Sequence, residues 1–260
     1  MQSLKHSLVC ITGASSGIGA ACATAFAREG ASLFLSARRA DRLEQLSGRL
    51  RKEYNIRVLT RTLDVRNQQL VANTFNTLPP EWKPIDILVN NAGLSRGLTK
   101  LHEGSLQDWE EMIDTNVKGL LYVSRAVLPG MVQRNSGHVI NIGSIAGRQV
   151  YPAGNVYCAS KYAVRAISQG MRMDLLGTRV RVSTVDPGLV ETEFSLVRFR
   201  GDAKRAEQVY TDTAPLHPDD VADIVVYCAT RPPHVDIAEV VVMPTVQASV
   251  HHLHRGGKAP

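Results

Sequence analysis

Residues 8–19 read Leu8-Val9-Cys10-Ile11-Thr12-Gly13-Ala14-Ser15-Ser16-Gly17-Ile18-Gly19. An apolar run is followed here by a glycine-rich turn, and the alanine-rich stretch 20–27 comes next. This order predicts a buried strand, a tight turn and a helix. The glycines allow unusual backbone angles and let a pyrophosphate approach the N-terminus of the helix. The spacing is Gly-x-x-x-Gly-x-Gly, not the commoner Gly-x-Gly-x-x-Gly, but its place between a strand and a helix indicates nucleotide binding.

Strand-like and helix-like runs alternate along the rest of the chain. We expect strands at residues 6–12, 31–37, 56–62, 85–90, 137–143, 180–186 and 238–243. We expect helices at residues 17–29, 39–54, 67–78, 105–134, 155–177 and 217–231. This alternation predicts an α/β fold, a single-domain Rossmann-type doubly wound parallel sheet of about seven strands with helices on both faces. The domain is expected to occupy residues 1–250.

Two segments depart from the alternation. Residues 189–215 form a long, partly helical excursion, and we expect it to be a lid over the substrate rather than an ordinary surface loop. Residues 251–260 form a C-terminal tail with histidines at 251, 252 and 254. The tail has no acidic or cysteine partners for these histidines, so we expect no metal site there. Docking of the tail on a neighbouring subunit is the expectation.

Composition limits the function classes. The chain has 260 residues, 44% of them hydrophobic, which is enough for one sizeable core. Its net charge of +6 comes from scattered Lys and Arg residues, so we expect no nucleic-acid partner. No apolar run has the length of a signal peptide or a membrane span, so we expect no membrane association and a cytoplasmic location. The four cysteines are expected to be small core residues in a reducing compartment. They are Cys10, Cys22, Cys158 and Cys228.

Tyr157 and Lys161 stand four residues apart in a predicted helix, so they lie on one helix face. A phenol beside an ammonium group ionises more easily than a free phenol, which makes Tyr157 a candidate general acid or base. Ser144 directly follows a predicted buried strand, and its hydroxyl could polarise a carbonyl beside the tyrosine. Taken alone, such a Tyr and Lys are most often a surface pair, so their interpretation depends on the other motifs.

Together, the motifs resemble the short-chain dehydrogenase/reductase family. The matching pieces occur in the family's order between about residues 6 and 245, and they are Thr12 to Gly19, Asp64, Asn90-Asn91-Ala92-Gly93, Asn116, Ser144, Tyr157, Lys161 and Pro187-Gly188. The stretches 142–148 and 187–202 further resemble the NADP-dependent 3-hydroxy acid dehydrogenases, which oxidise serine, L-allo-threonine and related acids.

The resemblance implies hydride transfer between a nicotinamide and an alcohol carbon. Tyr157, as a phenolate, would take the hydroxyl proton, while Ser144 binds the substrate oxygen. Lys161 would lower the pKa of the phenol and hold the nicotinamide ribose. Asn116 would anchor a water that links the lysine to bulk solvent. A homotetramer is also implied, built partly on the helices at 105–134 and 155–177.

The same resemblance assigns the cofactor contacts. The pyrophosphate and its ribose would meet Gly13, Ser15, Ser16, Gly17, Ile18 and Gly19. The adenosine half would meet Asp64, Val65, Asn90, Ala92 and Gly93. The nicotinamide half would meet Tyr157, Lys161, Pro187, Gly188, Val190 and Thr192. We expect Thr12 and Asn91 to tie strands together rather than to touch the cofactor.

The end of the second strand favours NADP over NAD. NAD-preferring enzymes carry an acid there that accepts from the ribose 2′-hydroxyl, whereas this chain has Ala37. Arg38 and Arg39 follow, and a guanidinium suits bidentate phosphate binding. The alternative is two exposed arginines that merely open a helix.

Two arginines are candidates for binding a substrate carboxylate. Arg148 follows the catalytic serine by four residues, and Arg198 lies on the predicted lid. We favour Arg148 because it is nearer to Ser144, although a salt bridge of Arg148 to Glu191, Glu193 or Asp202 is an equal alternative.

The predicted function is therefore NADP-dependent, reversible oxidation of the 3-hydroxyl of short 3-hydroxy acids of the serine, L-allo-threonine, 3-hydroxypropionate and 3-hydroxyisobutyrate type. Two alternatives remain at this stage. One is an NADPH-dependent carbonyl or 3-oxoacyl reductase, and the other is a non-catalytic NADPH-sensing protein.

The arginine assignment predicts a cofactor-selective defect. The substitution Arg38→Ala should raise the Michaelis constant for NADP strongly and leave that for NAD little changed, since only NADP carries the 2′-phosphate. Steady-state kinetics with each cofactor measures this. Equal losses with both cofactors would contradict the assignment.

Overall fold

The computed structural model describes residues 3–256, so the end of the expected tail, 257–260, lies outside the described residues. Its centre is a seven-stranded parallel sheet in the order β3-β2-β1-β4-β5-β6-β7. The strands are β1 (Leu8–Thr12), β2 (Ser32–Ala37), β3 (Val58–Thr62), β4 (Ile87–Asn90), β5 (Gly137–Ile142), β6 (Val180–Pro187) and β7 (Glu239–Val242). The α/β prediction is confirmed, and each strand begins and ends within two residues of its expected bounds.

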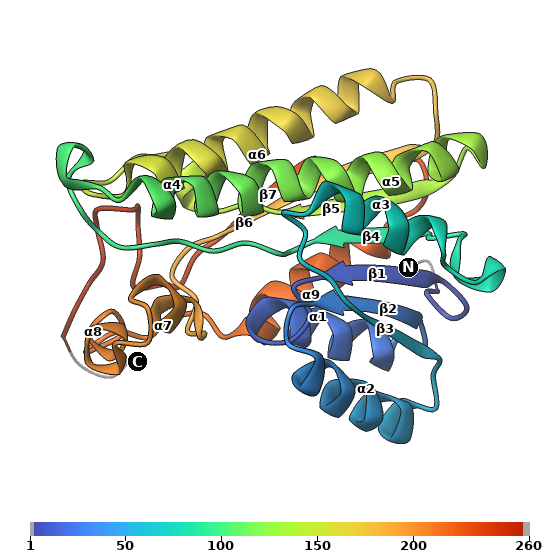
Figure 1. Ribbon diagram of the computed structural model, residues 1–260, viewed down its shortest axis with the longest axis horizontal. Coiled ribbons are helices and arrows are strands. Elements are labelled where there is room, and N and C mark those ends of the chain that lie inside the picture. Colours follow the sequence, from blue (N-terminus) through green and yellow to red (C-terminus); the bar gives the residue numbers. More distant parts are fainter. Residues whose placement is uncertain (1–2, 257–260) are drawn as a thin grey trace.

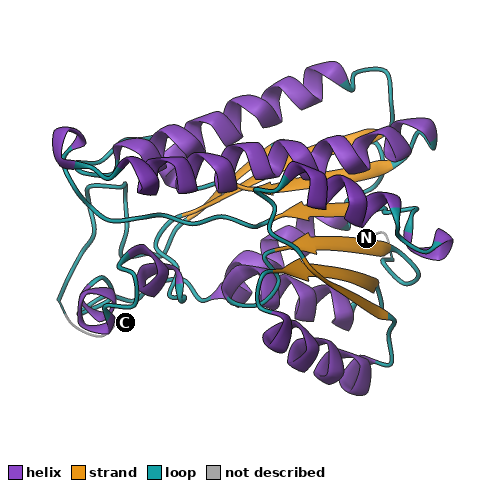
Figure 2. Cartoon of the chain, in the orientation of Figure 1, coloured by secondary structure: helices purple, strands orange, loops and turns teal. Residues whose placement is uncertain are grey.

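Helices cover both faces of the sheet (Figures 1 and 2). One face carries α1 (Gly17–Arg28), α2 (Ala40–Tyr54) and α9 (Pro218–Ala229). The other carries α3 (Gln68–Asn76), α5 (Leu120–Gln133) and α6 (Asn155–Asp174). The central strands are apolar on both sides because both faces are covered; all residues of β1 and β2 are buried.

The long helix expected at 105–134 is not one α-helix. It consists of α4 (Leu106–Ile113), a π-helical turn η3 (Asp114–Gly119) and α5. Asn116 lies in the π-helical turn. Such turns shift the side chains that follow them and are common at functional sites.

The chain order reverses on the two sides of β1, which pairs with β2 on one side and with β4 on the other. At such a switch point, the loops after neighbouring strands turn to opposite faces of the sheet and leave a crevice at their carboxyl ends. The loops after β1, β4, β5 and β6 meet there, and they carry the residues singled out from the sequence.

The predicted lid lies over this end of the sheet as α7 (Phe194–Arg198) and α8 (Ala203–Gln208) (Figure 1). The described part of the tail folds back on the same chain. The Arg255 guanidinium donates to the Thr211 carbonyl at 2.7 Å, and the Gly256 amide donates to the Asp212 carbonyl at 3.2 Å. Residues 251–256 therefore contact their own lid segment, whereas the sequence suggested docking on a neighbouring subunit.

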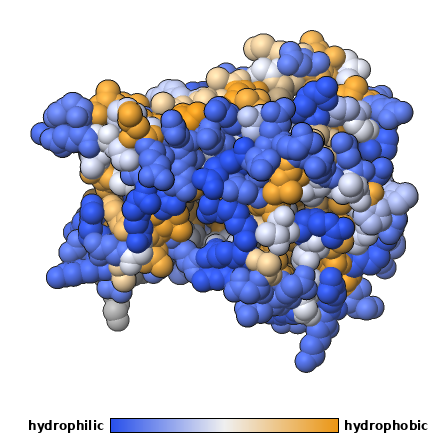
Figure 3. Space-filling view, in the orientation of Figure 1, coloured by the Kyte–Doolittle hydropathy of each residue, from blue (hydrophilic) through white to orange (hydrophobic). Residues whose placement is uncertain are grey.

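Two apolar residues on a helix expected to take part in a subunit contact are core residues. Val123 and Val127 on α5 are buried against the sheet. The exposed apolar residues of α5 and α6 are different ones, including Leu121, Val132 and Tyr162. Figure 3 shows apolar atoms along the upper edge of the molecule, over these helices.

All four cysteines are buried and free, as expected. Within residues 3–256, no helix is both long enough and apolar enough to cross a membrane. In the same part of the chain, no group of three or more His, Cys, Asp or Glu side chains is arranged to hold a metal ion.

Candidate active site

A cavity of about 530 Å³ lies at the carboxyl ends of the central strands. The loops after β1, β4, β5 and β6 form its floor, and the lid and the tail close it from outside. Most predicted site residues border it, namely Gly13, Ser16, Gly17, Ile18, Ala92, Gly93, Ser144, Tyr157, Lys161, Pro187, Gly188, Val190, Thr192 and Arg198. Leu253 and Arg255 of the tail also border it, although neither was predicted.

The turn between β1 and α1 and the start of α1 require glycine at particular positions. Gly13 has φ +66°, and a Cβ there would lie 2.9 Å from the Ala92 Cα. A Cβ on Gly19 would lie 2.4 Å from the Asn91 amide nitrogen, so Gly19 serves packing rather than ligand contact. The Ser16 side chain does not cap α1. The backbone N–H groups in the first turn of α1 therefore have no side-chain cap. They lie at the cavity floor, where they could bind a pyrophosphate.

Thr12 and Asn91 join this turn to the loop after β4. The Thr12 hydroxyl accepts hydrogen bonds from the backbone amides of Asn91 and Ala92, both at 3.1 Å. The Asn91 side chain donates to the carbonyls of Thr12 (2.9 Å) and Gly13 (3.2 Å). Their predicted role as structural ties is confirmed.

Two predicted cofactor contacts have side chains that point into the protein interior. The Asn90 amide donates to Ser124 (3.0 Å) and Asn141 (2.9 Å) and is buried. Val65 is buried in the core beside Gly119. The sheet interior already uses both side chains, so the predicted contact of these two residues with the adenosine half would come from their backbone.

The four predicted catalytic residues come together from three elements. Tyr157 and Lys161 lie on α6, Ser144 follows β5, and Asn116 lies in η3. The Lys161 ammonium donates to the Ile142 carbonyl at 2.9 Å and lies 6.0 Å from the centre of the Tyr157 ring. Tyr157 and Lys161 are nearly inaccessible to solvent, with 8% and 7% exposure. Proton transfer between groups of this site can therefore take place out of contact with bulk water.

The Asn116 side chain acts as a tie. Its carbonyl oxygen accepts from the Leu94 amide at 2.8 Å, and its amide group donates to the Leu94 carbonyl (2.8 Å) and to Ser160 (3.0 Å). Both amide atoms already have protein partners. The side chain holds the loop after β4 against α6, and the predicted water contact of Asn116 stays a prediction.

Burial controls the protonation of the site. It lowers the pKa of Lys161 to about 8, although the nearby Asp186 charge acts in the opposite direction. It also raises the pKa of Tyr157, and the Arg198 charge and the Ser144 hydroxyl offset only part of that effect. The net direction is opposite to the lowering expected beside Lys161, because desolvation of the buried phenolate outweighs the stabilising groups around it.

The structure reverses the preference between the two candidate arginines. The Arg148 guanidinium donates to Asp186 at 2.7 Å and also binds Glu239, and it does not border the cavity. Arg148 is therefore held in an ion pair, although with partners other than those considered from the sequence. Two acidic residues of β6 and β7 face it, and their pairing with it was not visible in the sequence.

Arg198 instead points into the cavity from α7. Its guanidinium carbon lies 5.5 Å from the centre of the Tyr157 ring and 5.1 Å from that of Phe194. One terminal nitrogen donates to the Tyr151 hydroxyl at 3.2 Å, while the buried Nε has no hydrogen-bond partner. A buried donor without a partner is costly, so this guanidinium is suited to receive an anion.

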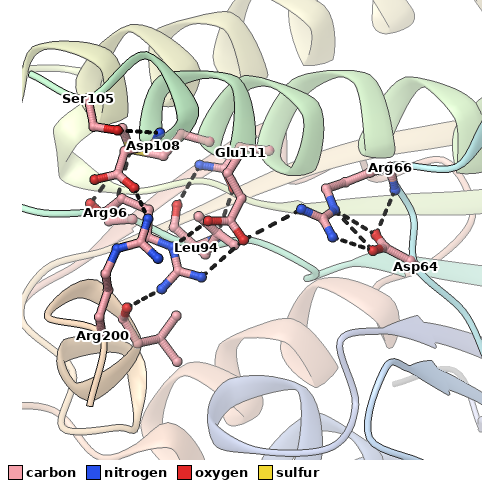
Figure 4. Close-up of polar contacts among 12 residues, drawn as sticks. Asp64, Arg66, Leu94, Arg96, Ser105, Asp108, Glu111 and Arg200 are labelled. Atoms are coloured by element: carbon pink, nitrogen blue, oxygen red, sulfur yellow. Dashed lines mark hydrogen bonds and ion pairs between the residues drawn. The ribbon is translucent and has the colours of Figure 1, made fainter.

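A chain of alternating charges holds the C-terminal end of α7 (Figure 4). Arg66 binds Asp64 at 2.6 Å and Glu111 at 3.5 Å, and Glu111 binds Arg96 at 2.6 Å. Arg96 also donates to the Val197 carbonyl of the lid. Hydrogen bonds from Arg96 hold the pKa of Glu111 below its usual value. Sequence reasoning missed this chain, because three of its four links join residues that are 15 to 101 positions apart and follow no spacing rule.

The predicted phosphate arginines lie at the end of β2, beyond the edge of the cavity. Arg38 is exposed. Arg39 donates to Ser15 (3.3 Å) and Ser16 (2.6 Å) of the glycine turn, and also to Glu193 of the lid (2.9 Å). The structure therefore brings Arg39, but not Arg38, into contact with the turn.

The fold, the glycine turn and the Ser144–Tyr157–Lys161 group define a dehydrogenase site, and the chain belongs to the short chain dehydrogenase family, which matches residues 7–201. It is 49% identical to the NADP-dependent 3-hydroxy acid dehydrogenase YdfG of Salmonella typhi, over 94% of this chain and 99% of the relative. It is 41% identical to the NADP-dependent 3-hydroxy acid dehydrogenase of Schizosaccharomyces pombe, over 98% and 99%.

A solved structure described as the closed form of serine dehydrogenase complexed with NADP+ has 47% sequence identity and a TM-score of 0.90. The alignment covers 96% of this chain and 100% of that chain. The family predicted from the motifs is confirmed.

From the position of Tyr157 we expect that its substitution lowers turnover and leaves nucleotide binding intact. Tyr157→Phe keeps the ring and removes the proton, so turnover should fall by roughly the 10²–10⁴-fold that general acid–base catalysis contributes. Nucleotide affinity, measured by fluorescence titration, should stay near that of the native protein. Near-normal turnover in the variant would exclude Tyr157 as the proton-transferring group.

The charge chain predicts that Arg96 anchors the lid. Arg96→Met should destabilise the protein by about 1–3 kcal/mol, the usual range for a charged hydrogen bond, because Arg96 is only 12% exposed. Arg200→Met is the matched control, since its pair with Asp108 is 54% exposed on the arginine side. Urea unfolding and chymotrypsin cleavage near Phe199 should both report a larger change for Arg96→Met. Indistinguishable variants would show that the Arg96 contact does not hold the lid.

Proposed function

We propose that this protein is an NADP-dependent oxidoreductase that reversibly oxidises the 3-hydroxyl of short 3-hydroxy acids. The observation that carries the substrate assignment is Arg198, which borders the same cavity as Tyr157, lies 5.5 Å from the centre of its ring and has a buried Nε without a hydrogen-bond partner. The printed names of the relatives from Salmonella and Schizosaccharomyces support both the cofactor and the substrate class.

Residues of this chain would bind the dinucleotide along the cavity, from the pyrophosphate to the nicotinamide. The glycine turn and the first turn of α1 would take the pyrophosphate, because the start of α1 has no side-chain cap and the glycines allow close approach to the backbone. Pro187, Gly188 and Thr192 would border the nicotinamide end. Bound NADP supplies the hydride-accepting ring, whose positive charge also lowers the pKa of Tyr157.

In oxidation, the Tyr157 phenolate takes the hydroxyl proton as the same carbon loses a hydride. The Ser144 hydroxyl donates to the substrate oxygen and stabilises the charge that develops on it. Lys161, buried beside Tyr157 and pointing to the end of β5, favours the phenolate by its charge. Arg198 holds the carboxylate, so the reacting hydroxyl faces Tyr157.

A carbonyl or 3-oxoacyl reductase is the second candidate, and the apolar part of the cavity wall favours it. Leu98, Leu189, Val197 and Val209 border the cavity and would suit a longer apolar chain. A substrate panel in both directions, with NADP and with NAD, separates the two candidates. A non-catalytic nucleotide sensor would show binding without any change in NADPH absorbance.

We also propose a homotetramer in the cytoplasm. The exposed Leu121 and Tyr162 on α5 and α6 support a subunit contact on these helices. The four buried, free cysteines are consistent with a reducing compartment.

If Arg198 binds the substrate carboxylate, its substitution should lower activity only on substrates that carry this charge. Arg198→Met should lower kcat/KM for 3-hydroxy acids by about 30-fold or more, which is the scale of a lost buried charge pair. It should change kcat/KM little for the matching methyl esters, which carry no charge. Arg200→Met, two residues away on the surface, serves as the control. Equal losses for acid and ester in Arg198→Met would rule out a clamp.

A further inference from the structure

The N-terminal end of the lid carries a carboxylate that lies among arginines of another element. Glu193 directly precedes α7 and contacts the start of α2. Its carboxylate accepts hydrogen bonds from Arg42 at 2.6 and 2.8 Å and from Arg39 at 2.9 Å. These hydrogen bonds, those from Arg42 first, hold the pKa of Glu193 below its usual value, so the group is charged at neutral pH.

The same arginine cluster is where a 2′-phosphate would bind. Arg39 is fixed by Ser15 and Ser16, so its guanidinium is already held beside the glycine turn. Arg38 is exposed next to it, and Ala37 leaves the end of β2 without an acid. A phosphate recognised here would need the guanidinium hydrogens that Glu193 now uses.

We propose that Glu193 determines cofactor specificity by competing with the 2′-phosphate of NADP for Arg39 and Arg42. This inference rests on the proposed use of NADP. Two anions cannot share one guanidinium edge, and a charged carboxylate left in place repels the phosphate. NAD carries a 2′-hydroxyl instead, so it neither displaces Glu193 nor is repelled by it.

The two ends of the lid differ in a way that makes this exchange possible. The C-terminal end of α7 is bound by groups that touch no cofactor residue, since Arg96 donates to the Val197 carbonyl and the Gly97 amide donates to the Arg198 carbonyl at 2.9 Å. The N-terminal end is bound through Glu193, and its neighbours Thr192 and Phe194 border the cavity. Binding of a 2′-phosphate to the arginines would therefore release only the N-terminal end of the lid, which lies on the cofactor side.

The test is the substitution Glu193→Gln, which keeps the shape and removes the charge. Dissociation constants of the full chain are measured by calorimetry for NADP, NAD, 2′,5′-ADP and 5′-AMP. NADP and 2′,5′-ADP should bind about three- to thirtyfold more tightly to the variant, the scale set by two partly exposed ion pairs. NAD and 5′-AMP should change less than twofold.

Glu191→Gln is the matched control. Glu191 lies two residues away on the same segment and is exposed, so its substitution removes the same charge away from the arginine cluster. It should leave all four dissociation constants within about twofold. Weaker NADP binding by Glu193→Gln would overturn the inference, because Glu193 would then organise the arginines. Equal tightening of all four ligands would overturn it too.

Arg39→Met distinguishes this inference from the cofactor assignment. If Arg39→Met abolishes the preference for 2′,5′-ADP over 5′-AMP while Glu193→Gln has no effect, only the role of Glu193 is wrong. If the native protein shows no such preference, the proposed NADP site itself is wrong, and the inference is overturned with it.

Discussion

The contact between the glycine turn and the loop after β4 is the constraint on which the rest of the site depends. β1 and β4 are neighbours in the sheet, and their following loops meet at the switch point. Thr12 and Asn91 bind each other's backbone there, and Gly13 and Gly19 leave room for the approach. A side chain at either glycine would push the two loops apart. The cavity floor would then lose its shape before any catalytic residue was touched.

Burial affects the site in two ways. It keeps water away from Tyr157 and Lys161, and it makes their charged forms less favourable. The catalytic tyrosine and lysine are almost fully removed from water, which disfavours the charged form of each. Burial therefore opposes the ionisation of Tyr157, and the positive charge of Arg198 on the lid offsets only part of that effect. The protonation of Tyr157 thus depends on its surroundings in the folded protein, and not on Lys161 alone.

The lid is held almost entirely by arginines. Arg96 fixes its C-terminal end, Arg39 and Arg42 hold its N-terminal end, and Arg198 projects from it into the cavity. Arginine serves all these places because its planar guanidinium can bind two groups at once and stays charged when partly buried.

Much of this protein could be predicted from the sequence. Alternating apolar runs gave the seven strands and most helices, because burial on both sheet faces leaves a local periodic pattern. The glycine turn and the Tyr157–Lys161 pair are also local, since one turn of helix places both side chains on one face. The break of the long helix at η3 was not predicted, because a π-helical turn has no clear local signature.

Only the tertiary structure decided which arginine borders the cavity and which carboxylates the others bind. Arg148 is 38 residues from Asp186 and 91 from Glu239, and Arg39 is 154 from Glu193. Ion pairs over such separations depend on where the strands and the lid meet in space. Proximity in sequence to Ser144 favoured Arg148, but the loop after β5 that carries both residues places this arginine against Asp186 of β6 and Glu239 of β7. Local sequence determines which chemistry is available, and the packing of distant elements determines which groups are free to use it.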